Sequence, residues 1–256
     1  MQNFNYHTHT VRCGHATGKD DEYIQSAIHA GFKVLGISEH IGFEGWDDKN
    51  ERIAFKDLNQ YIKDMQALKE IYNDKIDIKI GFEFEYFSDK ETYLKEMLSK
   101  VDYMIVGQHA KSFDQYYDRT CNDDDVDMYA SQICAALDHK LTKYVAHLDY
   151  FLLGKETFSK RNEIAIENIC DAVLRNDAYV EMNLKGTTYG KKMYHDKLQY
   201  IYPHYDVFRI VASKGCKVVF GYDAHSPQML EVRNKEELLK EEFKDLHLNF
   251  QDTIEL

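Results

Sequence analysis

The chain has 256 residues, and its 44 Asp and Glu against 32 Lys and Arg give a formal net charge of −12. With 44% hydrophobic and 30% charged residues, and no apolar run of about 18 residues, the composition excludes an intrinsically disordered or membrane-spanning chain. The acidic balance argues against a general nucleic-acid or membrane-surface binder, because such proteins need positive charge to replace the counterions of phosphates. The length, with only 2 Pro and 13 Gly, favours one domain over residues 1–256.

The cysteines indicate a reducing compartment. Their number is odd, they are widely spaced and no C-x-x-C occurs, so neither a disulfide framework nor a cysteine zinc site is predicted. They are Cys13, Cys121, Cys134, Cys170 and Cys216. The N-terminal sequence MQNFNYHTHT has no basic segment followed by an apolar stretch, and we therefore expect a cytoplasmic protein.

Short apolar runs alternate with longer segments of helical spacing, which is typical of repeated βα units. Apolar residues recur at helical spacing from Leu58 to Tyr72 and from Ala165 to Leu174, and Asp20 is the expected N-cap of a helix that ends before Gly31. Repeated βα units predict a parallel sheet, either closed into a barrel or open and doubly wound. Strands are predicted at seven runs: 4–6, 34–37, 76–80, 103–106, 144–146, 179–182 and 218–220.

Polar side chains follow all seven predicted strands at their C-terminal ends. Because these ends lie on one face of a parallel α/β fold, residues scattered over more than 200 positions are expected to converge in one pocket. In chain order they are His7 and His9, His40, Glu83 and Glu85, His109, His147 and Asp149, Glu181 and Asn183, and Asp223 and His225.

This set predicts a metal site. His7 and His9, like Asp223 and His225, are spaced i, i+2, so on a strand each pair faces the same side. Imidazole and carboxylate are ligands for divalent Zn, Mn and Fe, and their number favours two or three ions over one. A single histidine at a strand end is more often a packed core residue, and only the whole constellation favours metal. Glu39, Glu44 and Glu85 are either ligands or hydrogen-bond partners of the ligands.

The ordered motifs resemble those of the PHP (polymerase and histidinol phosphatase) superfamily of metal-dependent phosphoesterases, closest to its stand-alone histidinol-phosphate phosphatase branch. The motifs span nearly the whole chain: HTHT at 7–10, His15, SEH at 38–40, GFE at 81–83, GQH at 107–109, AHLD at 146–149, EMN at 181–183 and DAH at 223–225. The resemblance implies a distorted (βα)7 TIM-like barrel with its active site at the C-terminal ends of the strands and three divalent ions of Zn, Mn or Fe.

Matched motif by motif, the resemblance implies a ligand set for each ion and places Glu39, Asp149, Glu181 and Asn183 outside the ligand shell. Glu83 would bridge two ions, and Asp223 or a metal-bound water would protonate the leaving alcohol. The first ion would be held by His7, His9, Glu83 and Asp223, the second by Glu83, His109 and His147, and the third by His15, His40 and His225.

The resemblance implies a phosphomonoesterase that cleaves a small phosphate ester, most simply L-histidinol phosphate, by attack of a metal-bridging hydroxide. A phosphodiesterase or exonuclease on nucleotides, and a non-catalytic metal-binding module, are the alternatives. No nucleic-acid or membrane partner is expected, and the oligomeric state is left open. Tyr222 and Leu184 depart from the usual residues of the family and are expected to border the pocket. Basic residues expected to contact the substrate are Arg12, Lys111, Arg161 and Lys185, with Arg119, Lys191 and Lys192 also following strand ends.

Overall fold

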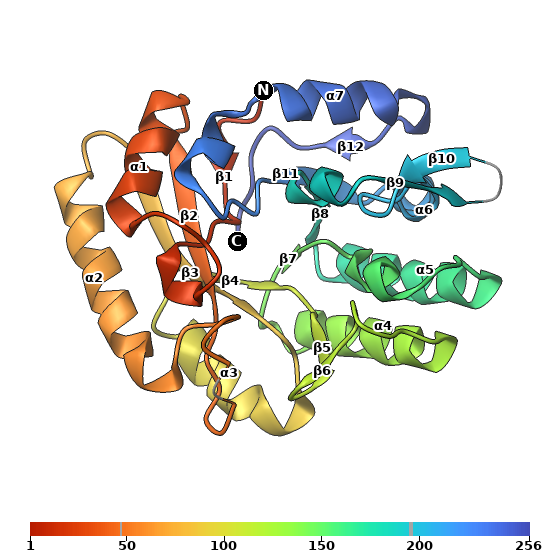
Figure 1. The fold of residues 1–256 in the computed structure, drawn as a ribbon, viewed down its shortest axis with the longest axis horizontal. Coiled ribbons are helices and arrows are strands. Elements are labelled where there is room, and N and C mark those ends of the chain that lie inside the picture. Colours follow the sequence, from red (N-terminus) through yellow and green to blue (C-terminus); the bar gives the residue numbers. More distant parts are fainter. Residues whose placement is uncertain (47, 195–196) are drawn as a thin grey trace.

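The computed structural model describes residues 1–46, 48–194 and 197–256, and its centre is a curled sheet of eight parallel strands (Figure 1). The strand order is β1-β2-β3-β4-β7-β8-β11-β12. This order follows the chain, as expected when each strand is joined to the next by a crossover that packs on the outer face. The bounds are β1 Phe4–Asn5, β2 Val34–His40, β3 Asp77–Phe84, β4 Tyr103–Val106, β7 Tyr144–Val145, β8 Tyr179–Asn183, β11 Lys217–Gly221 and β12 Asn249–Phe250.

Helices cover the outer face of the sheet, and two small hairpins project from its loops (Figure 1). The hairpins are formed by β5 (Ala110–Ser112) with β6 (Gln115–Tyr116), and by β9 (Lys191–Tyr194) with β10 (Lys197–Tyr200). The α-helices are α1 Asp20–His29, α2 Leu58–Ile71, α3 Glu91–Leu98, α4 Asp123–Asp138, α5 Lys160–Arg175, α6 Tyr205–Lys214 and α7 Asn234–Glu242. Short 3-10 helices are η1 Val11–Cys13, η2 Phe55–Asp57, η3 Ser88–Lys90, η4 Tyr150–Gly154, η5 Lys185–Tyr189, η6 Pro227–Glu231 and η7 Lys244–Leu246.

All seven predicted strands are present, and the distorted barrel is confirmed. The eighth strand, β12, is too short to carry a periodic signal and was not predicted. One cap was placed wrongly: α1 begins at Asp20, Lys19 occupies the N-cap position, and the Asp20 carboxylate instead accepts hydrogen bonds from Arg12.

The barrel interior is filled by aromatic and aliphatic side chains from alternate positions of the strands. Phe4 and Tyr6 form this cluster together with Tyr103, Ile105, Tyr144, Ala146, Tyr179 and Val219. The C-terminal residues Ile254 and Leu256 pack against it. Because side chains alternate between the two faces of a strand, Glu181 lies on the same face of β8 as Tyr179, and it contacts His7 in the barrel mouth. The interior cluster therefore forms the floor of the site above it.

Side chains help to close the barrel where β1 approaches β11. Only one isolated parallel bridge, Thr8 to Ala224, links these two segments through the backbone. The Gln2 amide exchanges hydrogen bonds of 2.8 and 2.9 Å with the backbone of Phe220, and Asn5 Oδ1 accepts from the Tyr222 N–H at 3.0 Å. These amides satisfy backbone groups that would otherwise be left unpaired in the interior.

Across residues 1–46, 48–194 and 197–256, none of the helices combines the length and apolar character required to cross a lipid bilayer.

Candidate metal centre

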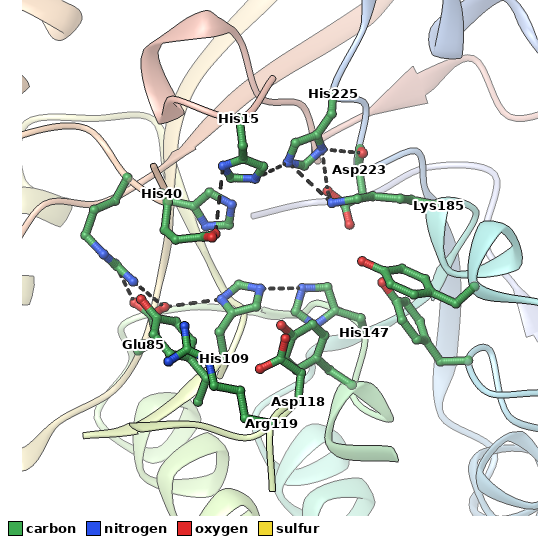
Figure 2. Close-up of a pocket in the computed structure, with 16 residues that line it drawn as sticks. His15, His40, Glu85, His109, Asp118, Arg119, His147, Lys185, Asp223 and His225 are labelled. Carbon is green, nitrogen blue, oxygen red and sulfur yellow. Dashed lines mark hydrogen bonds and ion pairs between the residues drawn. The ribbon is translucent and has the colours of Figure 1, made fainter. Parts of the chain in front are cut away.

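The polar residues that follow the strands meet at the mouth of the barrel (Figure 2). Six of them, His40, Glu85, His109, His147, Asp223 and His225, line a cavity of about 370 Å³, whereas His7, His9 and Glu83 are fully buried. His40 is the last residue of β2, Glu83 is the second-last residue of β3, and His147 follows β7. His7 and His9, His15, His109, Asp223 and His225 come from the segments after β1, η1, β4 and β11. All nine residues that the sequence predicts as ligands are therefore close together.

Glu83 lies at the centre of this group, and its two oxygens face different histidines. Oε1 lies 2.8 Å from Nε2 of His147 and 3.4 Å from Nε2 of His109. Oε2 lies within 3.2 Å of a ring nitrogen of each of three others: His7, His9 and His40. One carboxylate thus connects two sets of imidazoles, an arrangement suited to a ligand that bridges two ions.

Small residues on the neighbouring strands make room for buried carboxylates. A Cβ atom at Gly107 would lie 1.8 Å from Oε1 of Glu83, and one at Gly221 would lie 1.9 Å from Oε2 of Glu181. Backbone strain is present at two predicted ligands, since His147 has φ 25° and Asp223 has φ 46°. Non-glycine residues adopt such values at a free-energy cost, and they are concentrated at functional sites.

The ring nitrogens of several histidines are arranged as metal ligands require. Nδ1 of His225 faces the carbonyl oxygen of Asp223 at 2.9 Å, and Nδ1 of His15 faces the carbonyl oxygen of Asn50 at 3.0 Å. These oxygens can only accept, so in each neutral ring the proton is on Nδ1 and Nε2 keeps a lone pair. The two Nε2 atoms nevertheless lie 2.8 Å apart. A cation between such lone pairs removes their repulsion, so the residues fit a metal ion.

The same pattern recurs around Glu83. Nδ1 of His7 lies 2.7 Å from Oε2 of Glu181, while its Nε2 lies 3.0 Å from Nε2 of His9. Oε2 of Glu83 is buried, and although three ring nitrogens lie within 3.2 Å of it, no described residue forms a hydrogen bond of good geometry with it. Buried polar atoms are normally paired, and one left without a partner indicates a ligand or ion that belongs there.

The charges in the site favour the metal-binding protonation states of His9, His40 and Glu83, whereas Glu181 and Glu83 raise the pKa of His7 against the effect of burial. Burial and the neighbouring histidines lower the pKa of His9 and His40 well below the usual value, so both rings are neutral. Burial opposes ionisation of Glu83, but the surrounding histidines, His7 first, outweigh it and lower the pKa of this carboxyl. Neutral imidazoles and an ionised carboxylate are the forms that coordinate divalent cations.

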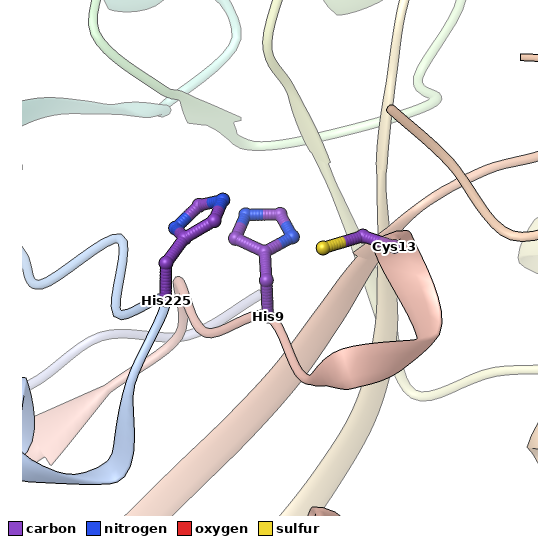
Figure 3. A group of neighbouring side chains, drawn as sticks. All are labelled: His9, Cys13 and His225. Carbon is purple, nitrogen blue, oxygen red and sulfur yellow. The ribbon is translucent and has the colours of Figure 1, made fainter. Parts of the chain in front are cut away.

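Four of the five atom groups compatible with a shared ion are built from the predicted ligands. Within each group the ligand atoms lie within 4.8 Å of one another: His15, His40 and His225; His7, His9 and Glu83; His40, Glu83 and His109; and His7, His147 and Asp223. The fifth group joins His9 and His225 to Cys13 (Figure 3). Sequence reasoning missed Cys13, because an isolated cysteine carries no ligand spacing. Its Sγ donates to the carbonyl oxygen of Thr10 at 3.2 Å, and burial raises its pKa to about 12.

The residues expected outside the ligand shell differ in what they contact. Glu181 contacts His7 directly and also accepts from the Tyr144 hydroxyl at 2.7 Å. Asn183 Nδ2 donates to Glu181 at 2.7 Å and to Asp223 at 3.1 Å. The contacts with His7 and Asp223 fix the orientation of predicted ligands, and the other two hold Glu181 in place.

Glu39 and Asp149 are tied mainly to the backbone. Glu39 Oε1 accepts from the N–H and hydroxyl of Thr10, and its other oxygen is 3.9 Å from Nδ1 of His9. Asp149 accepts from the backbone N–H of His204 at 2.6 Å rather than from an imidazole. The structure therefore shows Asp149 holding the loop before α6 and not orienting a predicted ligand.

Of the four basic residues expected at the substrate, only Lys185 lines the pocket. Its Nζ lies 3.5 Å from Oδ1 of Asp223 and 3.3 Å from Nε2 of His225. The other three point elsewhere, because each is paired with carboxylates of its own surroundings. Arg12 pairs with Asp20 and Asp64, Lys111 with Asp125, and Arg161 with Asp124 and Asp127.

Neither departure from the family pattern borders the pocket. Tyr222 points away from it, and its hydroxyl donates to Oε1 of Glu236 on α7 at 2.5 Å. Leu184 is buried in the hydrophobic core. The expectation that these two residues face the substrate is wrong, because both lie on the core side of their strands' ends.

Several pocket residues lie in loops that the strand-end pattern does not identify, with the exception of Arg119, which was expected to follow a strand end. Arg52 donates two hydrogen bonds of 3.1 Å to Glu85, whose Oε1 lies 3.2 Å from Nδ1 of His109. Both side chains are buried. The Arg52 guanidinium packs against the face of the Trp46 ring, with the Arg52 Cζ 3.6 Å from the ring centroid. The remaining lining is polar and aromatic: Glu51, Tyr116, Asp118, Arg119, Tyr150, Tyr189 and Tyr202.

A curled parallel sheet with a histidine-rich site at its C-terminal edge defines a class of metal-dependent hydrolases built on the barrel. The PHP domain model matches residues 5–185, so the chain belongs to the PHP domain family.

Relatives and solved structures agree with this assignment. A protein of Deinococcus radiodurans named "Probable histidinol-phosphatase" is 28% identical over 232 residues, 86% of this chain and 85% of its own length. A solved structure from Listeria monocytogenes has a TM-score of 0.71 at 19% identity and covers 91% of this chain and 99% of that chain. The histidinol phosphate phosphatase of Lactococcus lactis, solved with zinc, L-histidinol and phosphate, has a TM-score of 0.69 at 16% identity, covering 97% and 95%. These two likenesses establish the fold.

Proposed function

We propose that this chain is a metal-dependent phosphomonoesterase that hydrolyses L-histidinol phosphate to L-histidinol and phosphate. The observation that carries the proposal is the position of Glu83, whose two oxygens face two separate sets of imidazoles. The name of the Deinococcus relative, whose match extends over 86% of this chain, supports the choice of substrate.

We assign three divalent ions to the site, with Glu83 between the first and second. His7, His9, Glu83 and Asp223 would hold the first, and Glu83, His109 and His147 the second. His15, His40 and His225, whose ring nitrogens already form one compact group, would hold the third. When bound, such ions lower the pKa of water to near neutrality and stabilise the negative charge that develops on a transferring phosphoryl group.

The side chains of the protein position the substrate. Lys185 remains an ammonium, because the Asp223 carboxylate raises its pKa against the effect of burial. Its Nζ lies at the pocket surface beside Asp223 and His225, where it can donate to a phosphate oxygen. The buried interior cluster beneath the site and the aromatic lining limit the access of bulk water.

Phosphate release from purified, manganese- or zinc-loaded protein tests the proposal. We expect turnover of L-histidinol phosphate, a rate at least about 100-fold lower for the diester bis(4-nitrophenyl) phosphate, and loss of activity in Glu83→Ala and His7→Ala. His29→Ala, which removes an exposed histidine of α1, is the matched control and should retain full activity. Wild-type turnover by Glu83→Ala, or preference for the diester, would refute the phosphomonoesterase.

A further inference from the structure

The pocket has a second charged wall that none of the predicted metal ligands forms. Asp118 and Arg119 come from the loop after β6, and Figure 2 places them on the His109 and His147 side of the pocket, away from Lys185. Glu51, from the loop before η2, lines the same cavity. The cavity thus has the Lys185 ammonium and His225 on one side and the Asp118 carboxylate on another.

Although the Tyr150 hydroxyl donates a hydrogen bond to Asp118, one oxygen of this carboxylate has no partner. Its Oδ1 is buried and accepts no hydrogen bond within residues 1–46, 48–194 and 197–256. The adjacent Arg119 does not neutralise it, because the Arg119 guanidinium lies over the Tyr116 ring, with Cζ 4.7 Å from the centroid. A buried carboxylate oxygen without a partner is costly, so a site that keeps one has a cationic or hydrogen-bonding partner that arrives with a ligand.

Aromatic rings continue the wall between Asp118 and the histidines. The Tyr150 ring meets the His109 ring edge-on at 4.8 Å and lies 5.1 Å from that of His147. Tyr202 follows at 6.2 Å from Tyr150. Such rings provide a flat apolar surface for a planar heterocycle and a favourable environment for a cation above their faces.

We propose that Asp118 binds the ammonium group of the substrate, so that the pocket selects phosphate esters of amino alcohols over those of neutral alcohols. This inference rests on the proposed phosphatase function and adds to it a residue that determines specificity. The phosphate would lie towards His225 and Lys185, and the ammonium group would point to the opposite wall. Pairing of the substrate ammonium group with the Asp118 carboxylate would also explain why a pocket that must bind an anion has an acidic residue in its wall.

Calorimetric titration of the manganese-loaded protein with L-histidinol and with 3-(imidazol-4-yl)propan-1-ol, which lacks only the amine, tests the assignment. We expect wild-type protein to bind L-histidinol at least about 10-fold more tightly than the analogue. In Asp118→Asn this ratio should fall close to 1. Asp252→Asn, which removes an exposed carboxylate outside the pocket, is the charge-matched control and should keep the wild-type ratio. Equal affinities in the wild type, or a ratio that survives in Asp118→Asn, would overturn the assignment.

Two further measurements distinguish this proposal from a role for Glu51 and from the proposed phosphatase function. Loss of selectivity in Glu51→Gln with selectivity kept in Asp118→Asn would transfer the role to Glu51 and refute Asp118. Phosphate release from L-histidinol phosphate is measured in parallel. Turnover without ammonium selectivity refutes the Asp118 assignment and supports the phosphatase, whereas Asp118-dependent selectivity without turnover supports the assignment and refutes the phosphatase.

Discussion

Nδ1 of His109 lies 3.2 Å from Oε1 of Glu85, and this contact determines which ring nitrogen faces the pocket. A carboxylate can only accept, so Nδ1 carries the proton and Nε2, 3.2 Å from Nε2 of His147, keeps its lone pair. Arg52 in turn holds Glu85 through two hydrogen bonds and lowers its pKa against the effect of burial. A loop residue thus acts on a predicted ligand through one intervening carboxylate.

Glu85→Gln should therefore weaken metal binding by about 10- to 100-fold, because an amide can present its NH2 group to His109 and reverse the tautomer. Arg52→Met leaves a buried carboxylate without its cation and should lower the free energy of unfolding by about 3–5 kcal/mol. The double variant Arg52→Met/Glu85→Leu is the informative control. It should regain stability in urea titrations while its metal affinity, measured by chelator competition, stays low. Recovery of both properties together would show that Glu85 has no positioning role.

Removal of metal should destabilise the fold at the barrel mouth. The Nε2 atoms of His15 and His225 lie 2.8 Å apart, and an ion bound between them at 1,000 times its dissociation constant would stabilise the native state by about 4 kcal/mol. We expect dipicolinate to lower the melting temperature and added Mn²⁺ or Zn²⁺ to restore it. In His15→Ala the shift on metal removal should be smaller. An identical melting temperature with and without metal would contradict the arrangement.

Cys13 provides a test of the ligand set, since it lies beside His9 and His225 (Figure 3). Its Sγ donates to a backbone carbonyl oxygen, and burial favours the thiol over the thiolate that binds metal. We therefore expect Cys13→Ser, which retains a donor, to keep the metal content per chain and kcat/KM within about 2-fold. Elemental analysis of both proteins decides the point. Loss of one ion per chain in Cys13→Ser would make Cys13 a ligand.

The site residues at the strand ends were predictable because histidines and carboxylates directly follow apolar runs that have the character of buried strands. Buried apolar runs identify β2, β3 and β11, and the first polar residues after them, such as His40, Glu83 and Asp223, must lie at one edge of a parallel sheet. The barrel follows from the same runs together with the family motifs, since periodicity alone allows an open sheet.

The loop residues were not predictable for a physical reason. Arg52 and Asp118 lie in irregular segments, where sequence spacing does not determine direction. Local charge was equally misleading for Arg12, whose partners Asp20 and Asp64 lie 8 and 52 positions away. Which basic residue reaches the pocket depends on which carboxylates are nearby, and only the tertiary structure shows those.

Tyr222 has a structural role in place of the expected contact with substrate. Its hydroxyl donates to Glu236 Oε1, and Glu236 Oε2 accepts from the backbone N–H of Gln2 at 2.7 Å, so the pair links α7 to the start of β1. Tyr222→Phe should lower the free energy of unfolding by about 1–3 kcal/mol, since it removes a donor from a buried carboxylate. We expect kcat/KM for L-histidinol phosphate to stay within about 2-fold. Urea titration of this variant, Glu236→Gln and the double variant should show non-additive losses; additive losses would contradict the link.

The ion pair between Asp138 and Arg175 gives a stability difference that depends on pH. Asp138 ends α4 and Arg175 ends α5, and two hydrogen bonds of 2.9 and 2.6 Å join them. The guanidinium lowers the pKa of Asp138 from 3.8 to about 2. A lowered pKa means that the stabilisation is present above pH 3.8, where the unfolded carboxyl is ionised, and disappears as the pH falls towards 2.

Asp138→Asn should therefore be less stable than the wild type at pH 7 and closer to it at pH 3. Both side chains are more than 40% exposed, so solvent screening limits the loss at pH 7 to less than about 1 kcal/mol. Urea titrations of metal-free protein at both pH values measure the difference without the contribution of metal binding. The difference at pH 7 should also shrink in 0.5 M NaCl, since salt screens exposed charges. Asn176 Nδ2 also donates to Oδ1 of Asp138 at 2.8 Å. A loss as large at pH 3 as at pH 7 would show that packing or this hydrogen bond, and not the ion pair, is responsible.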